Sequence, residues 1–556
     1  MKQQPWHDMY DEGVPTGIKI PETATLDDFI RSACLKYSDR SAFSNFDSTI
    51  TYRELDRQIE SLASYFQHIG LKKGDRIAVQ LPNLLQTPVA IFAALRAGCI
   101  VVNTNPLYTS HEMLVQFADS GAKAVVILEN FADKLEAIIP QTQIEHVVIA
   151  SIGDLLGSLK GRAVNFVLRN IRKEVPAYSL SYVRYTRAVE IGSKRKLEPV
   201  DLGHEETAFL QYTGGTTGTP KGAMLSHRNV IANILQIRAW FGTIELREGD
   251  VFLVPLPMYH IFSLTCNFVT TCNFGLTNVL ITDPRDIGSL LKQVAKHRVK
   301  MMIGVSTLFR GMLSHPHFSR VEWEKIDVIV SGGSSLDEPI ARRFTEHSGN
   351  VIIEGYGLSE ASPIVACGPF NNRKNVVTGT VGMPVPDTMV RIIDENGAEL
   401  PQGESGEIAV RGPQVMQGYW RKDEDTRAVL RNGWLLTGDI GFIDEKGYVT
   451  IVGRKKDIIY VSGFNVYPSE IEEVISKHPA VQECVVIGVK DEKSGERPFA
   501  FAVLKPESDV TPEQMKKYCA EFLTRYKIPK QVLFVSALPK NMLGKVIRNE
   551  VHSLLK

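Results

Sequence analysis

The sequence predicts an α/β protein in which a large N-terminal region, with two doubly wound α/β subdomains and a small β-barrel, precedes a smaller α+β C-terminal domain. Its 556 residues exceed what one hydrophobic core organises, since domains average about 100 to 200 residues. Short β-branched strands alternate with helical segments over most of the chain, which is typical of parallel sheets covered on both faces. Hairpin signals then follow, and the last hundred residues or so suit a compact α+β unit.

These patterns also predict the domain boundaries. We expect an N-terminal part over residues 1–455 and a C-terminal domain over 456–556. Within the N-terminal part, about 1–195 and 196–384 form the two α/β subdomains, and 385–455 forms the β-barrel.

The first subdomain begins with a helix signal. Thr51 and Glu54 form a capping-box pattern that opens a helix running toward Gly70. Strands are predicted at 76–81, 99–103, 124–128 and 146–151, with helices at about 87–98 and 131–140 between them.

The second subdomain and the two smaller units carry further signals. Asn396-Gly397 and Gly447 mark two tight hairpins in the β unit. Thr511 and Pro512, with Gln514, open a helix in the last unit. Further strands are predicted at 251–256, 278–282, 301–305, 327–333 and 351–357, and the last unit adds a helix at 469–477 with strands at 482–489 and 498–504.

Composition excludes several classes of function. Lys plus Arg equals Asp plus Glu at 63 each, so no global field attracts nucleic acid and small-molecule partners are favoured. The seven cysteines are scattered without a CxxC pair, which favours free thiols in a reducing cytosol and no zinc. We find no secretory apolar segment and no apolar run long enough to span a bilayer, so we expect a cytoplasmic protein.

One segment combines apolar and basic residues. From Leu155 to Arg172, apolar side chains are interspersed with lysines and arginines. Two interpretations remain: an amphipathic segment that rests on anionic lipid at the inner face of the cytoplasmic membrane, or a solvated linker helix. The basic residues are Lys160, Arg162, Arg169, Arg172 and Lys173.

The central motif is YTGGTTGTPKG, from Tyr212 to Gly222. Glycines let backbone N–H groups approach an anion, threonine hydroxyls add donors, and Lys221 supplies a charge for a polyphosphate. It is not a Walker A loop, because Lys221 lies between Pro220 and Gly222. A mobile polar turn is the plainer alternative.

Further motifs lie after predicted strands. GYGLSE (355–360) follows a strand directly, at the sheet edge where α/β folds bind ligands, and its Glu360 is a candidate Mg²⁺ ligand. SGGSS (331–335) ends the preceding strand, and LLTGDIG presents Asp439, a carboxylate able to accept both ribose hydroxyls. Taken alone, each of these motifs could be a structural turn. Two further candidates also have plainer alternatives: Lys545 could be a solvated lysine near the C-terminus, and His260 could be a core residue.

Taken together, these motifs resemble the adenylate-forming superfamily, and the chain is identified as a member. NTNPLYTSHEM, GPQVMQGYW, NGWLLTGDIG and SGFNVYPSEIEEV resemble bacterial long-chain fatty acid:CoA ligases most closely. The resemblance implies that Lys545, on a mobile C-terminal lid, holds the carboxylate against the α-phosphate of ATP, with His260 beside it. Lys456 would be the hinge between the β unit and the lid.

The resemblance also assigns the binding residues. Thr213 and Glu360 would hold Mg²⁺, Asp439 and Arg454 the ribose, and Gly463 would line the approach of the thiol. Ser359 stands where the family has threonine and keeps the hydroxyl. The remaining implied ATP contacts are Gly214, Gly215, Thr216, Thr217, Gly218, Lys221, Ser334, Glu354, Gly355, Tyr356 and Gly357.

The expected function follows from the resemblance: a long-chain fatty acid:CoA ligase that uses ATP, Mg²⁺ and CoA. Alternatives are a ligase for an aryl or shorter carboxylate, an enzyme that loads an acyl carrier protein, and a lipid-uptake module with a degenerate nucleotide site. Loose membrane association and a homodimer are further hypotheses.

Overall fold

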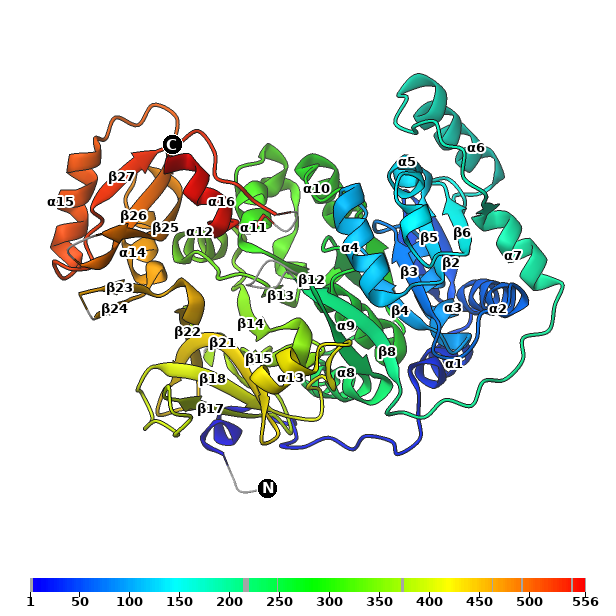
Figure 1. Cartoon of the computed structure of the whole chain (residues 1–556), viewed down its shortest axis with the longest axis horizontal. Coiled ribbons are helices and arrows are strands. Elements are labelled where there is room, and N and C mark those ends of the chain that lie inside the picture. The colour runs from blue at the N-terminus through cyan, green and yellow to red at the C-terminus, as the bar shows by residue number, and fades with distance from the viewer. Residues whose placement is uncertain are drawn as a thin grey trace.

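The computed structural model describes residues 4–213, 220–247, 249–371, 375–462, 464–491, 494–541 and 544–555. Within them the chain forms two large sheets, a smaller antiparallel sheet and a C-terminal α+β unit (Figure 1). The predicted mixed α/β class, with a large N-terminal region and a smaller C-terminal unit, is confirmed.

The first large sheet has the strand order β19-β9-β8-β4-β3-β5-β6-β7. Strands β4, β3, β5, β6 and β7 run parallel, as does β8 beside β4, whereas β9 and β19 are antiparallel. The strands are β3 (Arg76–Gln80), β4 (Ile100–Asn103), β5 (Ala124–Leu128), β6 (His146–Ala150), β7 (Val183–Arg184), β8 (Thr207–Thr213), β9 (Lys221–Ser226) and β19 (Gly418–Tyr419).

The second large sheet has the order β16-β15-β14-β13-β12-β10-β11-β1-β2, with a parallel centre and antiparallel ends. Its edge strands come from distant parts of the chain. The strands are β1 (Ser41–Asn45), β2 (Ser48–Thr51), β10 (Val251–Val254), β11 (Thr277–Leu280), β12 (Val299–Gly304), β13 (Val328–Ser331), β14 (Ile353–Gly357), β15 (Ile364–Cys367) and β16 (Met383–Pro384).

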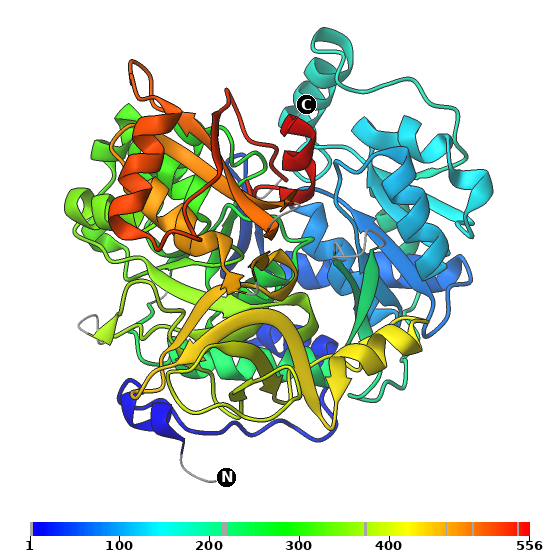
Figure 2. The ribbon, with the colours of Figure 1, turned by 60° about the vertical axis from the view of Figure 1, so that its left-hand side comes forward.

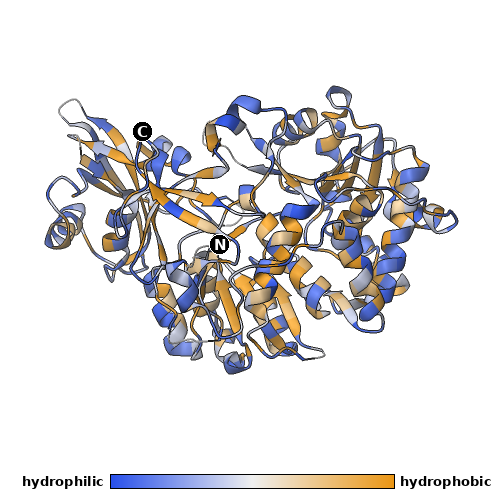
Figure 3. Cartoon of the chain, turned by 90° about the horizontal axis from the view of Figure 1, so that it is seen from below, coloured by the Kyte–Doolittle hydropathy of each residue, from blue (hydrophilic) through white to orange (hydrophobic). Residues whose placement is uncertain are grey.

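Helices cover both faces of these sheets because alternate strand residues point to opposite sides. In the first sheet, Ala78 and Val102 pack in one core with α4, whereas Ile77 and Val101 belong to the main core. Figure 3 shows apolar strands inside and polar residues on the peripheral helices. The helices are α1 (Leu26–Lys36), α2 (Tyr52–His68), α3 (Gln86–Arg96), α4 (Ser110–Ser120), α5 (Ala132–Glu136), α6 (Ser158–Phe166), α7 (Tyr185–Ser193), α8 (His227–Phe241), α9 (Ile261–Val269), α10 (Ile287–Lys296), α11 (Ser306–Leu313) and α12 (Glu338–Ser348).

Several helix starts follow from capping chemistry. The Thr51 side chain accepts from the Glu54 N–H, and the Glu54 carboxylate accepts from the Thr51 N–H, as predicted for α2. Thr511 and Gln514 form the same reciprocal pair at the C-terminal helix α15.

The β unit is a five-stranded antiparallel sheet. Asn396-Gly397 lies in the predicted turn, with Gly397 at φ +84°. Strand β21 is long and pairs with three neighbours, and within the described residues no ladder joins β17 to β20 or β22, so the sheet stays open where a closed barrel was predicted. Its elements are β17 (Met389–Ile393), β18 (Gly406–Arg411), α13 (Asp423–Val429), β20 (Leu430–Arg431), β21 (Trp434–Ile443) and β22 (Val449–Arg454).

The C-terminal unit has its own sheet and cores. The long hairpin of β25 and β26 forms its centre, with β27 parallel to β26. Its elements are β23 (Ile459–Val461), β24 (Phe464–Val466), α14 (Pro468–Ser476), β25 (Val481–Asp491), β26 (Gly495–Leu504), α15 (Pro512–Phe522), β27 (Gln531–Phe534) and α16 (Arg548–Val551).

The strands do not divide between the large sheets at residue 195. Strand β1 pairs with β11, aligning Phe43 with Asn278, so β1 and β2 belong to the second sheet. Strand β8 pairs with β4, aligning Phe209 with Val101, so β8 and β9 belong to the first. Alternation along the sequence locates strands, but long-range ladders decide which sheet each joins.

No helix in the described ranges is both long and apolar enough to cross a bilayer.

Candidate active site

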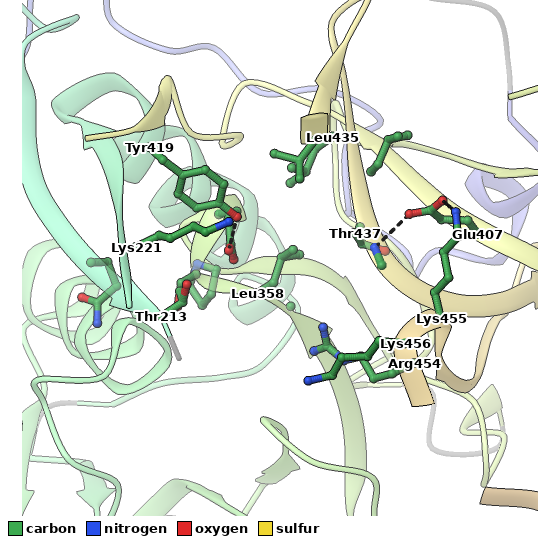
Figure 4. Close-up of a pocket in the computed structure, with 18 of the residues that line it drawn as sticks. Thr213, Lys221, Leu358, Glu407, Tyr419, Leu435, Thr437, Arg454, Lys455 and Lys456 are labelled. Carbon is green, nitrogen blue, oxygen red and sulfur yellow. Dashed lines mark hydrogen bonds and ion pairs between the residues drawn. The ribbon is translucent and has the colours of Figure 1, made fainter. Parts of the chain in front are cut away.

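A cavity of about 1040 Å³ is lined by most of the predicted site residues that the structure describes. It lies between the two large sheets, the β unit and the C-terminal tail, at the carboxyl end of β14. Figure 4 shows Lys221 and Tyr419 on one side of it and Arg454 and Lys456 on the other. The predicted residues that line it are Thr213, Lys221, His260, Gly355, Gly357, Ser359, Glu360, Arg454, Lys456 and Lys545.

The predicted phosphate cradle joins β8 to β9. Thr213 and Lys221 are aligned in the ladder of these strands, so both stand at the mouth of the connection. Five implied contacts lie outside the described residues, as does Gly463. They are Gly214, Gly215, Thr216, Thr217 and Gly218.

The Lys221 ammonium is already partnered. It forms an ion pair with the Asp425 carboxylate of α13 and lies 5.5 Å from the centroid of the Tyr419 ring. Lys221 is therefore held in place by an anion at the entrance to the predicted phosphate site.

The candidate metal ligand lies beside this pair. Glu360 is in the short 3₁₀ turn after β14, and its Oε1 accepts a hydrogen bond of 2.8 Å from the Tyr419 hydroxyl. Burial and Glu360 itself raise the pKa of Tyr419, so this phenol remains a donor. At Gly357 a Cβ would lie 2.3 Å from the Pro363 carbonyl oxygen, so only glycine fits there.

The candidate ribose residues form a chain of contacts in which Tyr356 and Asp439 are buried and Arg454 is partly exposed. The Tyr356 hydroxyl donates to Asp439 Oδ2 at 2.7 Å, and Arg454 Nε contacts Asp439 Oδ1 at 2.6 Å. Burial raises the pKa of Asp439, whereas Arg454 favours its charged form. Each carboxylate oxygen has a second lone pair, so Asp439 can still accept from a ligand.

Four predicted contacts do not border the cavity: Tyr356, Asp439, Ser334 and Glu354. Tyr356 and Asp439 are linked to the cavity through Arg454, because Tyr356 donates to Asp439 and Asp439 contacts Arg454. Glu354 instead accepts a 3.1 Å hydrogen bond from the Gly379 N–H, and burial raises its pKa to about 7.

His260 caps α9 beside the cavity. Its Nδ1 accepts from the Phe262 N–H at 3.4 Å, which leaves the proton of the neutral ring on Nε2. Burial, with a smaller contribution from Lys545, lowers the pKa of His260 to about 4. The ring is therefore neutral near pH 7 and offers an N–H donor.

Lys545 borders the same cavity although it is far along the chain. A tight turn positions it, because the Asn541 N–H donates to the Lys545 carbonyl at 2.8 Å and the Lys545 N–H donates to Asn541 Oδ1 at 2.9 Å. The Lys545 side chain can be reached from the cavity, and charged groups of the protein lie close to it, among them Arg454 and Asp439. Burial and the nearby Arg454 lower the pKa of Lys545, whereas Asp439 raises it.

Ion pairs hold the C-terminal unit against the second sheet's helices. Arg310 of α11 contacts Glu483 of β25 at 3.3 Å. Lys477 contacts Glu338 of α12 at 3.3 Å. A Cβ on Gly544 would lie 3.0 Å from the Thr307 Cβ, so the tail itself touches α11.

Four cavity or contact residues carry no predicted role. Tyr419 lies within the GPQVMQGYW segment, and Lys455, which contacts Glu407 at 2.8 Å, follows Arg454 directly. Asn541 lines the cavity beside Lys545. Asp425 gives no local signal, because only the folded chain brings α13 to Lys221.

Comparisons with known proteins identify the family. The model described as AMP-binding enzyme matches residues 30–420, and the AMP-binding enzyme C-terminal domain matches 470–545. The chain therefore belongs to the AMP-binding enzyme family.

Named relatives extend this result. The chain is 43% identical to the long-chain-fatty-acid–CoA ligase of Escherichia coli O6:H1, over 98% of this chain and 97% of that protein. It is 36% identical to the ligase of the same description from Bacillus subtilis, over 99% and 98%. The structure of ATP-bound MatB from Rhodopseudomonas palustris is similar with a TM-score of 0.82 and 29% identity, covering 96% of this chain and 99% of that one.

Proposed function

We propose that this protein is a long-chain fatty acid:CoA ligase that forms acyl-AMP and pyrophosphate from a fatty acid and ATP, and then transfers the acyl group to CoA. The observation that carries the proposal is that Lys545 of the C-terminal unit borders the same cavity as Lys221 and Arg454. Full-length similarity to long-chain-fatty-acid–CoA ligases supports the substrate class.

In the first half-reaction a carboxylate oxygen attacks the α-phosphorus of ATP, and the bond to pyrophosphate breaks. Two anions must approach each other, and a cation where negative charge concentrates lowers that barrier. Lys545 supplies this cation. The neutral His260 orients the carboxylate by donating from Nε2, without adding a second charge.

The nucleotide is held at both ends of the cavity. Lys221 and Thr213 receive the triphosphate, while Arg454 on the cavity wall and Asp439 directly behind it receive the ribose. Ser359, Gly355 and Gly357 line the wall between them, where a flat base can lie against the backbone.

The residues present also fit Mg²⁺. This ion usually takes one or two protein oxygens and completes its shell with phosphate oxygens and water. The Glu360 carboxylate and the Thr213 hydroxyl both line the cavity and are hard oxygen donors of that kind. When bound there, Mg²⁺ would neutralise the charge on the phosphates.

The second half-reaction needs Lys545 to leave, because the CoA thiol must reach the carbonyl of acyl-AMP. Lys456 lies in the 3₁₀ turn Lys455–Asp457, directly between the β unit and the C-terminal sheet. We assign the hinge to Lys456, the lid to residues 456–556 and the thiol's approach to Gly463. A lid with two positions also keeps water away from acyl-AMP, the mixed anhydride formed in the first half-reaction.

The ion pair of Lys221 gives a first prediction. Because Asp425 competes with the triphosphate for Lys221, Asp425→Asn should lower the Kd for ATP roughly twofold to fivefold, the scale of a partly exposed ion pair. Isothermal titration calorimetry at low salt measures it. Glu424→Gln, an exposed acid on the same helix, controls for net charge, and an equal effect of both variants would contradict the competition.

A substrate panel tests the function itself. Pyrophosphate release should depend on fatty acid, and AMP release should follow only when CoA is added, with the highest kcat/KM for long acyl chains. A preference for aryl or short-chain acids would favour a different CoA ligase. Adenylation that yields acylated carrier protein but no acyl-CoA would favour the carrier-loading alternative. Absence of pyrophosphate release with every acid in the panel would overturn the proposal.

A further inference from the structure

Helix α6 continues into a π-helical turn, Val167–Ile171, and stands out at the edge of the first sheet beyond β6. Figures 1 and 2 both show it projecting from the body of the molecule. No part of the proposed catalytic cycle uses this element.

One face of the element is anchored. Gly161 packs so closely on Gly153 that a Cβ would lie 2.1 Å from the Gly153 carbonyl oxygen. Asn165 Oδ1 accepts from the Gly153 N–H at 2.8 Å, and Leu168 is buried. Arg169 contacts the buried carboxylate of Glu129 at 2.6 Å. These contacts fix the orientation of the helix.

The opposite face is apolar and uncovered. Leu159 is 80% exposed, Phe166 59%, Val167 36% and Ile171 65%. At about 3.6 residues per turn, Leu159 and Phe166 lie on the side of α6 away from Gly161 and Asn165. Val167 and Ile171 begin and end the π-helical turn, so they share one side of it. The Lys160 ammonium donates to the carbonyl of Phe46, whose side chain is 47% exposed, so this aromatic residue lies near the start of α6.

Basic groups flank this apolar face. Residues 155–173 contain no Asp or Glu. Arg169 is neutralised by Glu129, and Arg172 contacts Glu174 at 3.5 Å. Lys160 donates to the Phe46 carbonyl and, after Lys296, also lowers the pKa of Asp47, so its charge is partly compensated. Arg162 donates only to a backbone carbonyl among the bonds found in the described part of the chain.

We propose that the face of Phe46, Leu159, Phe166, Val167 and Ile171, with Lys160 and Arg162 beside it, binds the surface of an anionic lipid bilayer. Apolar side chains on a fixed helix enter the boundary of headgroups and acyl chains, while flanking cations meet anionic headgroups. A second copy of this chain fits less well, because it would bring two basic segments without acidic residues together. The binding itself does not rest on the proposed function; a role of the bilayer in supplying the acyl substrate would.

Vesicle sedimentation of the full chain, without ATP or CoA, tests the proposal. We expect binding to vesicles of equal phosphatidylcholine and phosphatidylglycerol, and weaker binding to pure phosphatidylcholine or at raised salt. Lys160→Gln with Arg162→Gln should weaken partitioning about fivefold per residue. Leu159→Ser, Phe166→Ser and Ile171→Ser together should weaken it roughly tenfold or more.

Matched controls separate the outcomes. Phe522→Ser removes another side chain that is 61% exposed, on α15, and should leave binding unchanged. Each variant should keep wild-type circular dichroism and wild-type ligase activity on a micelle-free short fatty acid, so vesicle binding and catalysis fail independently. Absence of wild-type binding, equal binding by the α6 variants, or a dimer that the triple variant dissociates would each overturn the proposal.

Discussion

Lys545→Ala should lower the rate of acyl-adenylate formation roughly 10²-fold or more, the scale of one lost transition-state contact. The Lys545 side chain borders the cavity together with Arg454 and Lys221, which places its ammonium group where the carboxylate would meet the triphosphate. Single-turnover pyrophosphate release measures the effect.

The second half-reaction provides the internal control for Lys545→Ala. Acyl-CoA formation from preformed acyl-adenylate and CoA should stay within about twofold of wild type, because Lys545 has withdrawn by then. Lys517→Ala, an exposed lysine of α15, should change neither rate. Equal loss in both half-reactions would contradict the assignment of Lys545 to the first.

Asp439→Asn should raise the KM for ATP roughly tenfold to a hundredfold, the range for hydrogen bonds to a charged group. The substitution keeps the shape of the side chain but removes the charge that positions Arg454, which contacts Asp439 at 2.6 Å. Initial rates of pyrophosphate release at varied ATP measure it.

Glu445→Gln, an exposed acid between β21 and β22, is the matched control for Asp439→Asn and should leave the KM unchanged. A purely structural role for Asp439 would give a lower unfolding temperature with an unchanged KM for ATP. That pattern would remove Asp439 from the nucleotide site.

Local chemistry made much of the fold predictable from the sequence. The capping boxes at Thr51 and Thr511, the apolar run that forms β5 and the turn at Gly397 each lie within a few residues of the signal that predicts them. The position of GYGLSE directly after β14 was predictable for the same reason, because parallel strands present their carboxyl ends at one edge.

Long-range pairing was harder to predict. The place of β1 beside β11 depends on a ladder between residues more than two hundred positions apart, and no local pattern specifies it. Asp425 reaches Lys221 in the same way, across the chain. The role of Lys545 came from the family resemblance alone, since a tail lysine carries no local signal of its own.

Locking the C-terminal unit in place tests the central claim most directly. Lys477 and Glu338 face each other across the boundary of the two units at 3.3 Å, so Lys477→Cys with Glu338→Cys offers a pair for a short bis-maleimide. Among the native thiols, burial raises the pKa of Cys484 and of Cys272, the two that are incompletely covered, so the treated wild type serves as the control. The cross-linked enzyme should release pyrophosphate in one turnover but form no acyl-CoA. Acyl-CoA formation at the uncross-linked rate, or loss of adenylation as well, would contradict a lid that serves the two half-reactions from two positions.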